Sequence, residues 1–393
     1  MTDRMHLIAF VLATVGSVVV AHAEELEPGL TSEPPNDKRF VMCNRGCMVA
    51  YTAKIPGSDV LFERVPIPRG RFRIGSATSE NGRNEDKGPQ VEIEVEPFWI
   101  GKFEVTWGEF DQFYELRNTF REFDNRKIGL VTEDNQVDAV TAPSDVYDPL
   151  SRFPNKDDPD FAKYPVVTMT QYCAKQYTKW LSKLTGLHYR LPTEVEWEYA
   201  CRADTRTRYS YDDEIERLNE HAWFSDNTKG IARPVGGKKP NGWGLYDMHG
   251  NAGKWVLGQY DSYRQLRKLL DEDKPALVVP TTEYPRTIRG GSAADKAHQC
   301  RSAFRRVSSN SLLDEDPGFP QSPWWLATDP ETMQIGFRLV RPLHPLTEEE
   351  QTKLWDADVA SLREAVLQRL DDGRGLIGVV DSELTAAIQR LAK

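Results

Sequence analysis

The segment from Gly242 to Trp255 constrains the fold of this chain more than any other. Its sequence is Gly-Trp-Gly-Leu-Tyr-Asp-Met-His-Gly-Asn-Ala-Gly-Lys-Trp, which combines four glycines with three aromatic residues. Apolar residues do not recur at helical spacing, so the segment is predicted to be a loop with tight turns. Glycine permits the backbone conformations of such turns, and the aromatic rings supply the burial that the loop needs. A fold for this chain must therefore enclose an aromatic loop.

Four other segments accompany the loop. They are Gly101–Thr106 with Glu-Val-Thr, the Arg-Leu-Pro-Thr-Glu-Val-Glu-Trp-Glu-Tyr-Ala string that ends at Ala200, the Arg-Gly-Gly-Ser turn at 289–292, and Ile335–Arg341. In this order they resemble the motifs of the formylglycine-generating enzyme (sulfatase-modifying factor) family, whose hallmark loop reads Gly-Leu-Tyr-Asp-Met-His-Gly-Asn-Val-Trp-Glu-Trp. The chain departs from that hallmark at Gly253 and at Lys254, where the family has Glu.

The resemblance implies one α+β domain, related to C-type-lectin-like folds and rich in irregular structure, over residues 61–343. Residues 24–60 are expected to form a flexible lead-in, Pro-rich and polar at 24–40, with a short strand candidate at residues 48–51. Apolar residues at helical spacing after residue 347 predict one helix that ends near residue 371 and a second over about 381–391. Residues 344–393 are therefore expected to form a short helical extension.

Capping residues predict where the helices of the main domain begin. Thr106 followed by Glu109 is typical of a capping box. A second helix is expected from Thr170 to Leu184, and a third after Thr193. The acidic residues after Thr193 suit the first turn of a helix, so a structural role is preferred to a catalytic one for them. The polar stretch 118–163 is expected to be an irregular insertion.

The first 23 residues have the pattern of a secretory signal peptide. Basic Arg4 precedes an apolar run from Leu7 to Val20, and Ala21 and Ala23 supply small residues before a predicted cleavage site. An uncleaved anchor helix is the alternative, although the run is short for a membrane span. We expect export to the periplasm or the medium, with no integral membrane span after cleavage.

The charge balance and the cysteines bear on partners and on compartment. The formal net charge is −10, which argues against nucleic acid as a partner. In an oxidising compartment the spacing of Cys43 and Cys47 favours a local disulfide over half of a metal site. Cys173 and Cys201 are expected to be buried thiols.

The resemblance places the chemistry after the Gly-Gly-Ser turn. In active members, cysteines three and eight residues after the serine bind copper and oxidise a substrate cysteine to formylglycine. Counting from Ser292, these positions hold Asp295 and Cys300. A carboxylate is a hard ligand and does not replace a thiolate at Cu(I). Copper is therefore not expected, and Cys300 is interpreted as a buried structural residue rather than as a catalytic thiol.

By resemblance the loop would also bind calcium, through a side-chain oxygen of Asp247 and the carbonyls of Gly250 and Ala252. Lys254 removes a carboxylate and places a cation at this site, while calcium needs several anionic oxygens. We expect the ammonium of Lys254 to occupy the cavity and to pair with Asp247. Calcium binding by the loop is the alternative.

Two functional hypotheses follow. The first is an exported, non-oxidase binding or accessory module whose partner is a protein, a peptide or a glycan. The second is an oxidoreductase of the formylglycine-generating type that uses Cys300 with another soft ligand. A ligand-capable Cys or His beside Cys300 in an open cleft would favour the enzyme, and an enclosed Cys300 with apolar neighbours would contradict it.

Overall fold

The computed structural model describes residues 27–80, 82–129, 131–139, 157–313, 323–326 and 334–391. The predicted signal peptide at 1–23 lies outside these residues. Among them, no helix has both the length and the apolar character that crossing a membrane requires.

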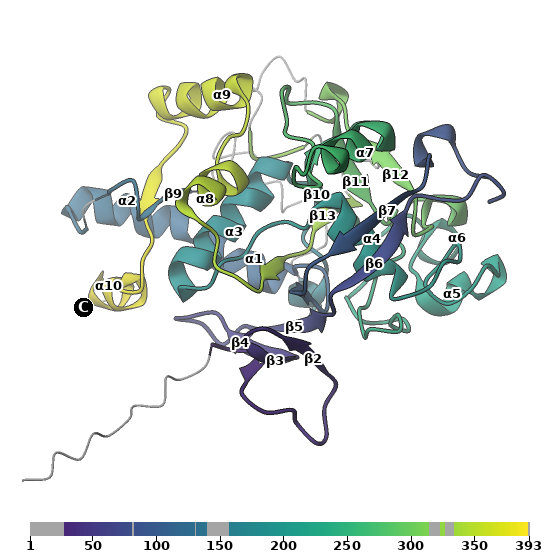
Figure 1. Cartoon of the computed structure of the whole chain (residues 1–393). Coiled ribbons are helices and arrows are strands. Elements are labelled where there is room, and N and C mark those ends of the chain that lie inside the picture. The colour runs from purple at the N-terminus through teal and green to yellow at the C-terminus, as the bar shows by residue number, and fades with distance from the viewer. Residues whose placement is uncertain are drawn as a thin grey trace, which may run out of the picture.

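Two four-stranded sheets form the centre of the domain (Figure 1). The first has the order β14 (Val340–Pro342), β8 (Phe98–Gly101), β5 (Leu61–Ile67) and β4 (Tyr51–Lys54), all antiparallel. The second has the order β12 (Arg305–Val307), β11 (Arg286–Arg289), β10 (Gly253–Gln259) and β13 (Ile335–Phe337), in which β10 and β13 are parallel. The loop at 242–255 leads directly into β10, so the second sheet fixes its end.

Smaller sheets surround this centre. They are β1 (Leu30–Thr31), β3 (Gly46–Val49) and β2 (Phe40–Cys43) in that order, the hairpin of β6 (Gly70–Ile74) and β7 (Val91–Val95), and the pair β9 (Gln136–Asp138) and β15 (Ile377–Val379). Residues 30–54 thus contain four strands, where the sequence predicted a flexible lead-in with one short strand candidate at residues 48–51. Trp99 explains the order of this segment, because its buried side chain packs with Leu30 and Met48 and donates a hydrogen bond to the Val49 carbonyl at 2.9 Å.

Helices cover the sheets as the capping residues predict. The helices are α1 (Trp107–Tyr114), α2 (Leu116–Arg126), α3 (Gln171–Thr185), α4 (Glu194–Arg202), α5 (Leu218–His221), α6 (Ser225–Thr228), α7 (Tyr263–Asp271), α8 (Glu348–Trp355), α9 (Ala360–Asp371) and α10 (Leu384–Leu391). Thr106, Thr170 and Thr193 are the N-caps of α1, α3 and α4, and the first and third form complete capping boxes. These predictions are confirmed.

Aromatic side chains fill the space between α1 and α3. The Phe113 and Trp180 ring centroids are 5.4 Å apart, and Phe110 stacks on Tyr177 at 5.8 Å. All four side chains are buried, so they contribute both apolar burial and favourable ring geometry.

Two further expectations are corrected. The described part of 118–163 contains most of α2, because Leu116, Phe120 and Phe123 recur at helical spacing and are buried. The helix expected from 347 to about 371 is two helices, α8 and α9. The break between them lets the Asp358 carboxylate reach Arg286 at 2.7 Å and Lys175 at 3.2 Å. Figure 1 shows the extension, in yellow, beside α2 and α3.

Candidate functional site

Positive backbone angles shape the loop that contains the candidate calcium ligands. Asp247 and Asn251 adopt φ values of 55° and 61°, and Gly250 has a φ of 73°. A Cβ atom at Gly250 would lie 2.1 Å from the Trp223 carbonyl oxygen, so only glycine fits there. Residues 247–255 of the loop are buried, and Asp247, Asn251 and Lys254 are each at most 1% exposed.

Three oxygen atoms converge on the ammonium of Lys254. The Nζ atom lies 2.5 Å from the Asp247 carbonyl oxygen, 2.7 Å from the Gly250 carbonyl oxygen and 2.8 Å from Oε1 of Glu104. The side chains of Lys254 and Glu104 are both 0% exposed. We call this group of four residues the Lys254 chamber. The structure therefore brings Asp247 and Gly250 together around one point, as the resemblance implies.

The ion-pair partner of Lys254 is Glu104, and the expected pairing with the Asp247 carboxylate is wrong. Asp247 contributes its main-chain oxygen, while its Oδ2 accepts a hydrogen bond from the Gly236 amide at 2.7 Å. Its Oδ1 atom is buried and has no hydrogen-bond partner among the residues that the structure describes. Burial, followed by the nearby charge of Glu104, raises the pKa of Asp247 from 3.8 to about 7.

Glu104 links the chamber to the rest of the loop. Besides its ion pair with Lys254, it accepts hydrogen bonds from the Ala252 amide at 3.0 Å and from Nδ2 of Asn251 at 2.7 Å. Ala252 thus contacts the chamber through its N–H, which donates to Glu104, whereas the resemblance implies that its carbonyl is a calcium ligand. A chemical role for Glu104 was not predicted from the sequence. The acidic side chain between Phe103 and Val105, in a segment with the pattern of a buried strand, was the one feature that could have indicated it.

The chamber does not fit a calcium ion. Calcium takes six to eight oxygen ligands, several of them anionic. Here the point where the oxygens converge is taken by a covalently attached ammonium, and in the described part of the chain only the Glu104 carboxylate contacts it. Within the described residues, no group of three or more His, Cys, Asp or Glu side chains is arranged to hold a metal ion.

Cys300 is enclosed, as the sequence predicts. It is 0% exposed and packs with Tyr209, Leu218, Ala222 and Phe224. Burial, with a smaller effect from the charge of Asp295, raises the pKa of the thiol well above its ordinary value. The thiolate is the form that binds metals and attacks as a nucleophile, so this environment suppresses both reactions.

Asp295, which replaces the partner cysteine, has a structural contact. Its Oδ2 accepts a hydrogen bond from the Ser292 hydroxyl at 2.8 Å, and its main-chain oxygen accepts one from the Ser225 amide at 3.0 Å. These contacts close the turn that follows Gly291. Asp295 therefore stabilises the loop geometry.

His249 lies between two cysteines. Its Nδ1 is 2.7 Å from the Cys300 carbonyl oxygen, and its Nε2 is 2.9 Å from the Ser210 hydroxyl and 4.0 Å from the Cys201 sulfur. Nδ1 donates to the carbonyl, and Nε2 accepts from the Ser210 amide at 3.1 Å. Burial lowers the pKa of His249 to about 3. A ligand-type side chain thus exists near Cys300, but the pocket around it is closed and both ring nitrogens are engaged.

The predicted disulfide between Cys43 and Cys47 is absent, and both thiols are free. In the β2–β3 hairpin Cys43 pairs with Gly46, and Cys47 pairs with Met42. Neighbouring pairs of a hairpin point to opposite faces, which directs the two thiols apart. The buried locations expected for Cys173 and Cys201 are confirmed.

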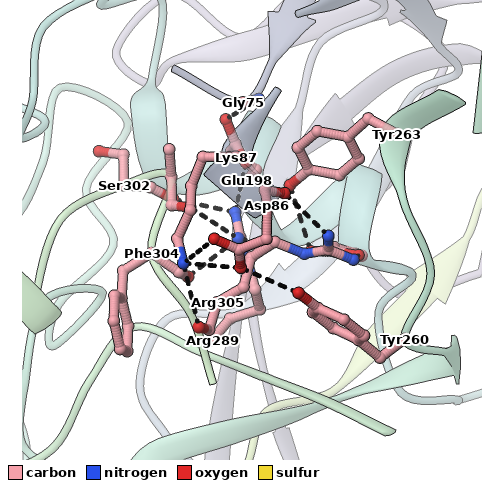
Figure 2. Close-up of polar contacts among 12 residues, drawn as sticks. Gly75, Asp86, Lys87, Glu198, Tyr260, Tyr263, Arg289, Ser302, Phe304 and Arg305 are labelled. Atoms are coloured by element: carbon pink, nitrogen blue, oxygen red, sulfur yellow. Dashed lines mark hydrogen bonds and ion pairs between the residues drawn. The ribbon is translucent and has the colours of Figure 1, made fainter. Parts of the chain in front are cut away.

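Glu198 of α4 belongs to a buried ionic network with Arg289, which Figure 2 shows. Glu198 pairs with Arg289 and, at 2.9 Å, with Nε of Arg202, and its Oε1 accepts a hydrogen bond from the Gly75 amide at 2.8 Å. Glu194 accepts from Nε of Arg305 at 2.6 Å. Each acid is matched by at least one guanidinium, which supports the structural interpretation over a catalytic one.

Residues 56–320 match the sequence model of the sulfatase-modifying factor enzyme 1-like domain family. The chain belongs to this family. It is 28% identical over 292 residues to the inactive Cα-formylglycine-generating enzyme 2 of Bos taurus, covering 67% of this chain and 88% of that protein. The fold assignment as a formylglycine-generating-enzyme-like α+β domain is confirmed.

Other similar proteins differ in length from this chain. The chain is 29% identical over 261 residues to the serine/threonine-protein kinase pkn1 of Chlamydia caviae, covering 65% of this chain but only 37% of the kinase. The chain therefore spans less than half the length of that relative. Among solved structures, PvdO from Pseudomonas aeruginosa superposes with a TM-score of 0.50 at 25% identity, covering 74% of this chain and all of PvdO.

Proposed function

We propose that this chain is an exported, non-oxidase member of the sulfatase-modifying factor family that acts as a binding or accessory module for a protein, peptide or glycan. The observation that carries the proposal is the enclosure of Cys300. The oxidase chemistry of the family needs reactive thiols, and a thiolate is disfavoured in this apolar pocket. Asp295, at the position of the second thiol, is engaged by Ser292.

The surroundings of Cys300 add support. Two hollows among the described residues lie elsewhere. One, of about 260 Å³, is between α10 and the α1–α2 and α3 surface. The other, a much smaller one, is lined by Glu194, Tyr263 and Arg305. Cys300 lines neither of them, and its side chain is fully buried.

The proposed export depends on the pattern of residues 1–23, with cleavage after Ala23. N-terminal sequencing of the protein secreted by an expressing cell tests this part. A mature chain that begins at Glu24 supports export, and a full-length chain that stays in the cytosol contradicts it.

The proposal is tested by an oxidation assay on the mature chain, residues 24–393. The protein is loaded with Cu(I) under oxygen and incubated with a sulfatase-type cysteine peptide, and the peptide mass is followed. A copper-loaded formylglycine-generating enzyme serves as the positive control. We expect no change in the peptide. Turnover that is lost in Cys300→Ser, in a variant that still folds, would establish the alternative, an oxidoreductase with an altered site.

A further inference from the structure

The Lys254 chamber has the geometry of a cation site built from backbone. The αL conformation of Asp247 and the glycine turn at Gly250 direct two carbonyl oxygens to one point, and Glu104 adds a carboxylate oxygen from the segment between β8 and α1. Converging buried carbonyls repel one another unless a donor or a cation lies between them, because none can reach water. The loop therefore requires a positive group at this point in order to keep its fold.

The chain supplies that group covalently. Lys254 is the second residue of β10 and pairs with Arg289 of β11, so the strand fixes its main chain. The side chain is fully buried and its three contacts match the three donor hydrogens of an ammonium. Because the cation is tethered, no binding equilibrium and no free metal are needed to occupy the chamber.

We infer that the ammonium of Lys254 is the built-in cation of this loop, and that the loop consequently folds without a divalent metal. Exchange of this one side chain should then convert the chamber into a calcium site. In Lys254→Glu, a carboxylate would replace the ammonium at a shorter reach, which leaves room for an ion. The new carboxylate would join the Glu104 carboxylate and the carbonyl oxygens of Asp247 and Gly250. Such a set of oxygens, in part anionic, suits calcium.

The wild-type protein gives the first half of the test. Its thermal midpoint is measured by circular dichroism in EDTA and in 5 mM CaCl2, with calcium titrated calorimetrically into the EDTA-treated, desalted protein. We expect the two midpoints to agree within about 1 °C, since a ligand that does not bind the folded state cannot shift it. A midpoint that falls in EDTA and recovers with calcium, or a calorimetric site of unit stoichiometry, would overturn the inference.

The Lys254→Glu variant gives the second half. Its midpoint is expected to be low in EDTA and to rise progressively with calcium, as a ligand that binds only the folded state requires. Tb³⁺ luminescence excited through tryptophan reports binding directly, since Trp255 is the next residue. The control is Lys254→Met combined with Glu104→Gln, which removes both charges and should not respond to calcium. If the variant is insoluble in EDTA, its yield on refolding is compared with and without calcium. A folded Lys254→Glu protein without a calcium or terbium response, or a refolding yield that calcium leaves unchanged, would contradict the inference.

Discussion

Replacement of Asp247 by Asn should stabilise the protein, and by more at high pH than at low pH. Burial and the neighbouring Glu104 raise the pKa of Asp247 from 3.8 to about 7. Between these two values the folded state binds more protons than the unfolded state, so its stability falls as the pH rises through this window. Asparagine does not titrate and tolerates the αL conformation that Asp247 adopts at a φ of 55°.

The magnitude follows from the two pKa values. One pKa unit corresponds to about 1.4 kcal/mol. The ionisation of Asp247 therefore costs about 1.5 kcal/mol at pH 5 and about 4 kcal/mol at pH 8.5, by linkage. The stabilisation of Asp247→Asn relative to the wild type, in free energy of unfolding, should therefore be larger at pH 8.5 than at pH 5 by about 2 to 3 kcal/mol. Other titrating groups are common to both proteins and cancel in this difference.

Urea denaturation at pH 5 and pH 8.5, followed by tryptophan fluorescence, measures the effect. Asp273→Asn is the matched control, because Asp273 also has a positive φ, of 53°, but is exposed. Its effect is measured at both pH values and subtracted from that of Asp247→Asn. If the remaining effect of Asp247→Asn is independent of pH, or if the substitution destabilises the protein more at pH 8.5 than at pH 5, the electrostatic description of the chamber is wrong.

Three further predictions concern buried groups. Burial lowers the pKa of His249 to about 3, so the imidazole takes up a proton on unfolding below about pH 6.5, and the free energy of unfolding falls as the pH drops from 6.5 to 5. In His249→Asn this fall, measured by urea denaturation, should be smaller by about 2 kcal/mol. Glu198→Gln removes the buried carboxylate that pairs with Arg289 and Arg202, and it should lower the free energy of unfolding by about 3 to 5 kcal/mol. Loss of an exposed ion pair costs under about 1 kcal/mol, so an effect of that size would contradict the role of Glu198 in the network. In native protein a thiol reagent should modify Cys43 quickly and Cys300 only on unfolding, as peptide mapping would show; rapid native labelling of Cys300 would mean that its pocket opens.

Local sequence rules predicted the elements whose causes are local. Thr106 and Thr193 begin helices because their hydroxyls and the acids three residues later satisfy the first amides, a pattern complete within four residues. The enclosure of Cys300 was also predictable, since an unpaired cysteine beside small and aromatic residues is commonly buried.

Features that depend on distant partners were missed. The partner of Lys254 was sought at Asp247, within the loop, and the structure provides Glu104 from another part of the chain. The αL conformation of Asp247 turns its carboxylate toward Gly236, which sequence spacing does not show. Apart from the strand candidate at residues 48–51, the strands of residues 30–54 were missed for the same reason, because the packing of this segment depends on Trp99.

A competition titration for Cu(I) tests most directly whether the oxidase site is lost. The mature chain, residues 24–393, is titrated anaerobically against a chromogenic Cu(I) chelator, in parallel with Cys300→Ser. Because the Cys300 thiol is enclosed and Asp295 replaces its partner, the two proteins are expected to withdraw copper from the chelator to the same extent. Tight binding of one Cu(I) by the wild-type chain that Cys300→Ser abolishes would contradict the proposed non-oxidase function.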